Sequence, residues 1–302
     1  MSDHDQLLVL VDPVARRLDG ESVRIAKDVL SAGADAKICL PEGPQEFARA
    51  LARRGHRRPV VLGDDRALLR VVTLLQRERD GRDSTPMAVA PMAAPGDEGA
   101  AGADSGEDGG TTVSVVPIGA PEGLETTRAL GVPQGAVGAA RAVLDGVVRR
   151  LDLLVDDGGG VVLTRLDVPA ARTLVPAQPT MWDTCRSLVR TLVRPPVPAG
   201  LAVRTHRLRI EADGVVLCDL DTPVEGLSAT GLEGGLAALT LVPADAPAVH
   251  TAVRTLSVAG PDFRYRADAT VSGPVTRRTW AVREAAWGLT VPVGAAGPVG
   301  SR

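Results

Sequence analysis

The 302-residue sequence has few aromatic side chains and no excess of positive charge. Three tryptophans, two phenylalanines and one tyrosine provide little surface on which nucleic-acid bases could stack. The formal charge of −3 provides no net attraction for a phosphate backbone. We therefore expect no nucleic-acid partner.

Lysine and histidine are also scarce. The only lysines are Lys27 and Lys37, and both fall within segments predicted to be regular elements rather than loops. The motif G-x-x-x-x-G-K-[ST] is absent, which excludes a phosphate-binding lysine of that type. The four histidines are isolated and no G-x-S-x-G occurs, so the sequence argues against zinc hydrolases and serine-based catalytic triads.

The three cysteines, Cys39, Cys185 and Cys218, are widely spaced, and no C-x-x-C occurs. This predicts neither a disulfide framework nor a zinc site, and we expect each cysteine to be a small buried residue. No run of about 18 apolar residues is present to cross a bilayer. No positively charged segment precedes the first apolar run, so we expect a cytoplasmic protein that can lie at the inner face of the membrane.

Residues 1–150 alternate short apolar runs with amphipathic segments, which is typical of an α/β domain with a parallel sheet covered by helices. Residues 79–111 interrupt this pattern with glycine, alanine, proline, serine and acidic residues, which predicts a disordered surface insertion. The predicted strands are residues 7–11, 36–40, 59–62 and 113–116, and the predicted helices are residues 21–30, 44–54, 67–76 and 136–149.

Residues 151–302 contain many short strand-like runs between turn residues, which predicts a second domain, an antiparallel β-sandwich. One segment differs, because residues 182–194 place Arg186, Arg190 and Arg194 on one face of a predicted helix. This helix could rest on an anionic membrane surface or pack across the junction of the two domains. The predicted strands are residues 161–166, 201–211, 215–220, 237–242, 254–258, 263–267, 279–282 and 289–291.

Three turns follow predicted parallel strands, and ligands of open parallel sheets bind beyond the carboxyl ends of the strands. The turns are Asp12-Pro13, Gly63-Asp64-Asp65-Arg66-Ala67 and the segment 117–123. We therefore expect the ligand-binding site at these turns.

The three turns resemble those of the diacylglycerol kinase catalytic family, in which successive strands end in Asn-Pro, Gly-Gly-Asp-Gly-Thr and Pro-x-Gly-Thr-x-Asn. The sequence Arg128-Ala129-Leu130-Gly131 is similar to the family's A-R-x-L-G, and residues 149–153 are similar to the R-x-L-D-L that leads into its β domain. The resemblance spans nearly the whole chain. It implies transfer of the γ-phosphoryl group of ATP to the hydroxyl of diacylglycerol or a similar lipid, with Mg²⁺ as cofactor.

In this family the Gly-Gly-Asp-Gly-Thr turn cradles the phosphates of ATP. One register matches Gly63 and Asp65, and a register shifted by one makes Asp64 the family aspartate. The resemblance implies that Gly63, Asp64 and Arg66 contact the nucleotide and that Asp65 lies near Mg²⁺ and the phosphates. The simpler alternative is that Asp64 and Asp65 only cap the helix that follows.

The remaining candidates come from the other motifs. Asp12 stands at the family's Asn-Pro and Gly119 at the glycine of the third turn, which implies nucleotide contacts, although Asp12 could equally form a plain strand-ending turn. Asp268 matches the first acid of a D-G-E motif late in the β domain, so the catalytic candidates are Asp65 and Asp268. The glycine cluster 231–235 is interpreted as a structural turn.

Three functions remain open. The first is a lipid kinase that acts on a lipid or membrane surface. The second is a non-catalytic member that binds a nucleotide or lipid as a regulatory module, because Asp64, Arg66 and Ala67 replace two glycines and a hydroxyl. The third is a kinase of another acceptor such as nicotinamide dinucleotide, against which the R-x-L-D-L match argues. A homodimer is compatible with all three.

Overall fold

The first part of the chain forms a parallel sheet. The structure, a computed structural model, describes residues 6–83, 112–170, 174–176 and 201–294. The parallel strands lie in the order β2-β1-β3-β4, as the α/β prediction requires. Their bounds are β1 Gln6–Val11, β2 Asp35–Cys39, β3 Arg58–Gly63 and β4 Thr112–Pro117.

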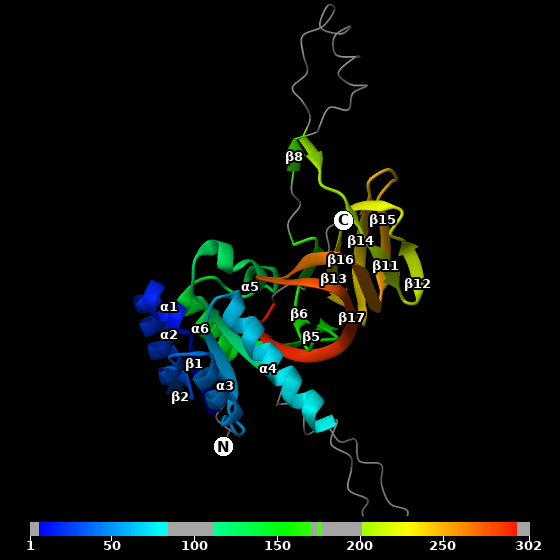
Figure 1. Cartoon of the computed structure of the whole chain (residues 1–302). Helices are drawn as coiled ribbons and strands as arrows, with labels where there is room; N and C mark the ends of the chain where they lie inside the picture. The colour runs from blue at the N-terminus through cyan, green and yellow to red at the C-terminus, as the bar shows by residue number, and fades with distance from the viewer. Residues whose placement is uncertain (1–5, 84–111, 171–173, 177–200, 295–302) are drawn as a thin grey trace, which may run out of the picture.

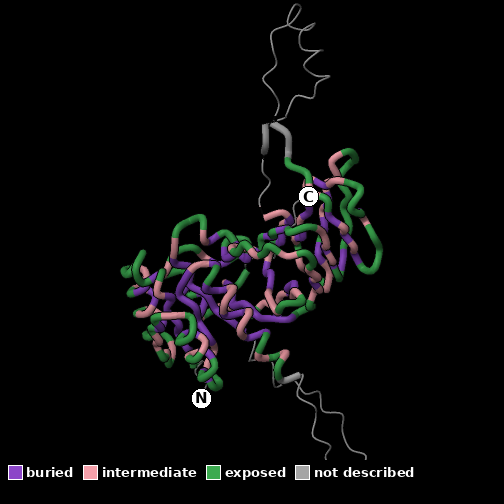
Figure 2. Tube along the Cα trace, viewed as in Figure 1, coloured by how far each residue is buried: buried purple, intermediate pink, exposed green. Residues whose placement is uncertain are grey.

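Helices cover both faces of this sheet. Along β1 the side chains of Leu7 and Val9 pack in one core and those of Leu8 and Leu10 in another, because successive residues of a strand point to opposite faces. The first core is closed by α1 (Pro13–Leu18), α2 (Gly20–Gly33) and α6 (Ala136–Asp145), and the second by α3 (Pro44–Ala52) and α4 (Asp65–Asp83). Figure 2 shows that the buried residues follow the strands between these two layers.

The second part of the chain is antiparallel and encloses a core of its own. Trp280 is fully buried there and meets Tyr265 edge to face, with ring centroids 5.1 Å apart. The strands are β5 Val147–Asp156, β6 Val161–Val162, β7 Arg165–Val168, β8 Leu174–Pro176, β9 Leu201–Val203, β10 His206–Arg207, β11 Arg209–Ala212, β12 Val215–Cys218, β13 Pro223–Glu233, β14 Leu236–Pro243, β15 Val249–Val253, β16 Thr255–Ala267 and β17 Thr270–Val291.

Strand β17 joins the two parts. It pairs with β16 and β5 in the antiparallel part, and near its end Gly288 and Leu289 pair in parallel with Thr112 and Val113 of β4. Figure 1 shows this long strand, in orange and red, curving from one part to the other. The C-terminal end of the described chain therefore extends the N-terminal sheet, and the boundary placed at residue 150 stays a prediction.

A buried polar network fixes this junction. The Arg58 guanidinium donates to the hydroxyls of Ser114 and Thr290, at 3.1 and 2.8 Å, and to the carbonyl of Val143 at 2.9 Å. Ser114 also donates to Thr290, at 2.8 Å. These four residues come from β3, β4, β17 and α6, so a single side chain links the last strand to three elements of the N-terminal part.

Most element predictions are confirmed, but several bounds are wrong. The helix predicted over 136–149 ends at Asp145, because Gly146 is an extended C-cap and the β-branched Val147 and Val148 continue as strand β5. Only glycine fits there, because an added Cβ would collide with the backbone of Ala142 and Val291. The helix after β3 runs to Asp83, five residues into the predicted insertion. Strands predicted over 161–166 and 201–211 are broken, and β8, β13 and β15 were not predicted.

Further predictions concern the cysteines, the glycine cluster, the insertion and one helix of the β domain. Cys218 is buried as expected, whereas Cys39 is half-buried. Gly234 and Gly235 lie in the turn between β13 and β14, which confirms the structural interpretation of the glycine cluster. Residues 84–111, Cys185 and the predicted helix 182–194 lie outside the described residues. Among the described helices, none has the length and apolar composition needed to cross a membrane.

Removing one hydroxyl from the junction network should destabilise the fold. Thr290→Val keeps the shape but removes the buried hydroxyl that accepts from both Arg58 and Ser114, and we expect a loss of about 1–3 kcal/mol in the free energy of unfolding. Urea denaturation measures this loss. Thr290→Ser keeps the hydroxyl and should lose less, and an equal loss in both variants would show that the network does not stabilise the junction.

Candidate functional site

The three predicted turns meet at the carboxyl ends of β1, β3 and β4. The Asp12 amide donates to the carbonyl of Leu62 at 2.9 Å, and the Ile118 amide donates to the carbonyl of Gly63 at 3.0 Å. A Cβ added at Gly63 would lie 2.8 Å from that of Ala67 and 3.0 Å from that of Asp12, so only glycine allows this close approach. The turns form one packed surface.

This surface is one wall of a cleft with a volume of about 760 Å³. The opposite wall comes from the antiparallel part, at Thr164, Arg165 and the connection between β16 and β17. The sequence-predicted residues that line the cleft are Asp64, Asp65, Arg66, Gly119 and Asp268. The cleft therefore brings together five of the seven candidates, from both parts of the chain.

Asp12 and Gly63 are not among the residues that line the cleft. Asp12 is 3 % exposed, and one of its oxygens accepts a hydrogen bond from the Val14 amide at 2.9 Å as the N-cap of α1. Its other oxygen pairs with Arg70 at 3.2 Å. Asp12 therefore acts in this structure as a helix cap, and Gly63 as a close-packing position.

Asp65 is buried, and each oxygen of its carboxylate accepts a backbone hydrogen bond. It is 2 % exposed, and its two oxygens accept hydrogen bonds from the backbone amides of Thr126 and Thr127 at 2.7 and 2.9 Å. These amides belong to the first turn of α5 (Glu125–Ala129), whose N-terminus favours a negative charge. Asp65 thus holds the third turn against the start of α4.

Asp64 is the N-cap of α4 and is less buried. One of its oxygens accepts a hydrogen bond from the Ala67 amide at 3.0 Å. Burial raises the pKa of Asp64 above its ordinary value, and the nearby carboxylate of Asp12 raises it further, against the hydrogen bond from Ala67. Asp64 lies beside Gly119, where an added Cβ would be 3.2 Å from its own.

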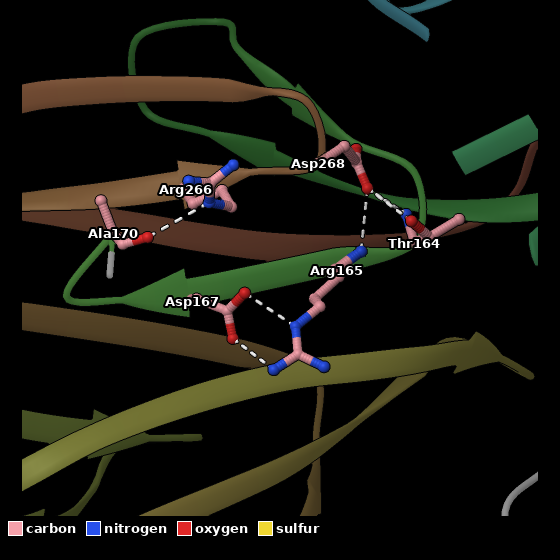
Figure 3. A network of polar contacts seen from close by, with 6 residues as sticks. All are labelled: Thr164, Arg165, Asp167, Ala170, Arg266 and Asp268. Atoms are coloured by element: carbon pink, nitrogen blue, oxygen red, sulfur yellow. Dashed lines mark hydrogen bonds and ion pairs between the residues drawn. The ribbon is translucent and has the colours of Figure 1, made fainter. Parts of the chain in front are cut away.

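Asp268 is engaged in the same way as Asp65, from the other side of the cleft. Its carboxylate accepts hydrogen bonds from the amides of Leu163, Thr164 and Arg165 at 2.6, 2.8 and 2.9 Å, and from the Thr164 hydroxyl at 2.6 Å. Figure 3 shows the contacts with Thr164 and Arg165. Asp268 has a positive φ of 47°, and its carboxylate secures the bend between β6 and β7.

The cleft has an excess of acidic side chains. Six acidic residues and three arginines line it. Of the arginines, Arg165 is paired with Asp167 at 2.7 Å, and Arg266 donates to the carbonyl of Ala170 at 3.1 Å (Figure 3). Arg66 is exposed at the start of α4. A polyphosphate in this cleft would meet a net negative wall.

Asp65 is the residue that the resemblance implies as a ligand of Mg²⁺. Mg²⁺ requires octahedral oxygen ligands and keeps several waters, but both oxygens of Asp65 already accept buried backbone amides. Among the described residues, no three His, Cys, Asp or Glu side chains are placed to hold a metal ion. The donor set does not fit Mg²⁺ at this position.

Sequence reasoning missed several residues of the site. Thr126 and Thr127 supply the amides for Asp65, and they directly precede the Arg128-Ala129-Leu130-Gly131 match, which could have drawn attention to them. Arg165 and Arg266 line the opposite wall. No motif marks these two arginines, because they reach the cleft only through the antiparallel pairing of β7 with β16.

These features define a two-domain α/β-plus-β protein with a cleft between a parallel and an antiparallel part. No protein-family model and no curated protein matches the sequence. Among solved structures, one of “a putative diacylglycerol kinase” from Bacillus anthracis str. Sterne has 12 % identity and a TM-score of 0.65, covering 98 % of this chain and 100 % of that one.

Two further structures from the same organism agree with this match. A second “putative diacylglycerol kinase” has 14 % identity and a TM-score of 0.65, and a structure described as a diacylglycerol kinase has 12 % identity and a TM-score of 0.63. Each covers 98 % of this chain and 100 % of the other. The chain therefore has the diacylglycerol kinase-like fold, and the resemblance expected from its sequence is confirmed at that level.

The structural role of Asp65 predicts a large effect on stability. Asp65→Ala leaves two buried amides unsatisfied, and we expect a loss of about 2–4 kcal/mol in the free energy of unfolding. The neighbouring exposed Arg66→Ala should change it by less than about 0.5 kcal/mol. Denaturant unfolding of both variants checks this, and a small loss in Asp65→Ala would refute the assigned role.

The raised pKa of Asp64 predicts a pH dependence. A carboxyl whose pKa is higher in the folded state binds more protons there, so its ionisation removes stability as the pH rises from the unfolded pKa through the folded pKa. Asp64→Asn keeps a helix-capping side chain and removes this ionisation. The stability of Asp64→Asn relative to the unmodified protein should therefore increase between about pH 4 and neutrality, and a flat difference would contradict the shift.

Proposed function

We propose that this protein is a non-catalytic relative of diacylglycerol kinases that binds a neutral, hydroxyl-bearing lipid in the cleft. One observation carries the proposal: the carboxylate of Asp65, one of the two motif-matched catalytic candidates, accepts hydrogen bonds from the Thr126 and Thr127 amides. Phosphoryl transfer depends on positioned charge at the phosphates, and a carboxylate that organises backbone does not supply it.

The composition of the cleft also argues for a neutral ligand. Polyphosphate requires cationic or glycine-rich contacts, whereas this cleft has twice as many acidic side chains as arginines. At the mouth of the cleft, Leu18 is 65 % exposed and Val14 is 43 % exposed. These apolar side chains on α1 would contact an acyl chain, and a carboxylate of the cleft would accept a hydrogen bond from the lipid hydroxyl.

The proposal is tested by thermal unfolding with ligands. Because a ligand that prefers the native state must stabilise it, short-chain dioctanoylglycerol should raise Tm, and ATP with Mg²⁺ should not. Leu18→Asp places a charge in the apolar mouth and should abolish the shift. The exposed Arg24→Gln on α2 is the control and should respond as the unmodified protein does. An increase in Tm with ATP and Mg²⁺ but not with dioctanoylglycerol would contradict the proposal.

A lipid kinase is the second candidate, and one observation favours it. Asp64 lines the cleft with a raised pKa, which suits a group that accepts a proton, and the shifted register makes it the family aspartate. The assay is incubation with labelled ATP, Mg²⁺ and diacylglycerol in mixed micelles, with Asp64→Asn in parallel. Labelled phospholipid that Asp64→Asn fails to form would establish the kinase and overturn the non-catalytic function.

A further inference from the structure

One face of α4 lines a second groove, with a volume of about 730 Å³, which the connection between β16 and β17 borders on the other side. The groove residues recur three or four positions apart and so form a single stripe along the helix. The opposite face of α4 is buried in the core of the N-terminal part. The stripe consists of Arg66, Leu69, Arg70, Thr73, Leu74 and Arg77.

This groove differs from the cleft in its charge. Four arginines line it, Arg66, Arg70 and Arg77 from α4 and Arg266 from β16, and no acidic side chain does. Arg66, Arg266 and Ala269 line both sites, so the two share a wall. The helix rises about 16 Å between its first and last groove arginine, at about 1.5 Å per residue. The positive charge is therefore spread along the groove.

One groove arginine, Arg70, is paired with Asp12 at 3.2 Å, whereas two others are held in place without being neutralised. Arg77 donates to the carbonyl of Gly159 at 3.3 Å and Arg266 to that of Ala170 at 3.1 Å, each through Nε. Within the described part of the chain, neither they nor Arg66 pair with a carboxylate. A guanidinium has five N–H donors, so positioned donors remain for a ligand.

Apolar side chains lie between these charges. Leu69 and Leu74 are partly buried at the foot of the groove, and Val271 is 47 % exposed at its edge. A guanidinium group can donate two parallel hydrogen bonds to the oxygens of one phosphate. An adjacent apolar surface favours the binding of a hydrocarbon chain. The groove is thus complementary to both parts of a phosphate ester of an aliphatic alcohol, the phosphate group and the hydrocarbon chain.

We propose that the α4 groove is a binding site for a phosphorylated amphiphile, with the phosphate on the arginines and the apolar chain on Leu69, Leu74 and Val271. The ligand could come from a lipid headgroup in a membrane or from a soluble phosphate ester, since both present this chemistry. The groove adjoins the cleft along a shared wall, and the proposal does not depend on whether the cleft binds a lipid or transfers a phosphoryl group.

Two variants isolate the groove from the cleft. Arg77 and Thr270 line the groove and do not line the cleft. Arg77→Gln removes one charge, and Thr270→Glu adds a carboxylate at an exposed position. The control is Arg24→Gln, which removes the same charge from α2, and the Tm of each variant without ligand verifies that it is folded.

Calorimetric titration with hexyl phosphate, hexanol and inorganic phosphate tests the ligand chemistry. We expect hexyl phosphate to bind more tightly than either of the others, and Arg77→Gln and Thr270→Glu to weaken it by about tenfold or more, a change of about 1.4 kcal/mol. Arg24→Gln should bind as the unmodified protein does. Hexyl phosphate that binds no more tightly than inorganic phosphate, or equally in all variants, would overturn the proposal.

Sedimentation with phosphatidylcholine vesicles, with and without phosphatidic acid, distinguishes the two sources. Binding that requires phosphatidic acid and is lost in Arg77→Gln would identify a membrane lipid as the ligand. Binding of hexyl phosphate without vesicle binding would identify a soluble ester. The absence of binding to both hexyl phosphate and the vesicles would overturn the site.

Discussion

The carboxylate of Asp65 and the two amides that donate to it fix the geometry on which the cleft depends. A buried ionised carboxylate is stable only when donors replace its lost water, and the N-terminus of α5 provides them. This contact draws the third turn against the start of α4. Gly119 then lies against Asp64, and the floor of the cleft is complete. The acid that the family resemblance assigns to phosphate chemistry has become part of the scaffold.

The second part of the chain repeats this arrangement from the opposite wall. Asp268 uses its carboxylate to secure the bend at Leu163, Thr164 and Arg165, so the two motif-matched acids both organise backbone. The cleft and the adjoining groove differ in the charges that line them. Acidic side chains dominate the cleft, and four arginines gather in the adjoining groove on α4. Phosphate-bearing ligands should therefore prefer the groove, and neutral ligands the cleft.

Much of the fold could be predicted because its signals are local. Alternating apolar residues such as Leu7 and Leu8 identify the strands, and parallel strands must bring their carboxyl ends together, which predicts where the turns meet. The end of α6 at Asp145 could not be predicted, because the residues after it pair with Thr290 and Val291 on a distant strand. The return of β17 to the first sheet has no local signal either.

The candidate site could be located from the sequence, but the roles of its residues could not be assigned. The donors to Asp65 lie 61 and 62 residues away, and those to Asp268 lie more than 100 residues away. Whether a carboxylate is free to bind a ligand depends on such distant partners, and a local sequence motif contains no information about them. The helix-capping alternative for Asp64 describes its contact correctly.

The central claim is that the committed carboxylate of Asp65 leaves no metal–nucleotide site in the cleft. Electron paramagnetic resonance tests this claim directly. Mn²⁺ replaces Mg²⁺ in a complex with a non-hydrolysable ATP analogue, and the spectrum of this complex is recorded without and with the protein. The account predicts that adding the protein leaves the Mn²⁺–nucleotide spectrum unchanged. A stoichiometric protein-bound Mn²⁺ signal that disappears in Asp65→Asn would contradict it.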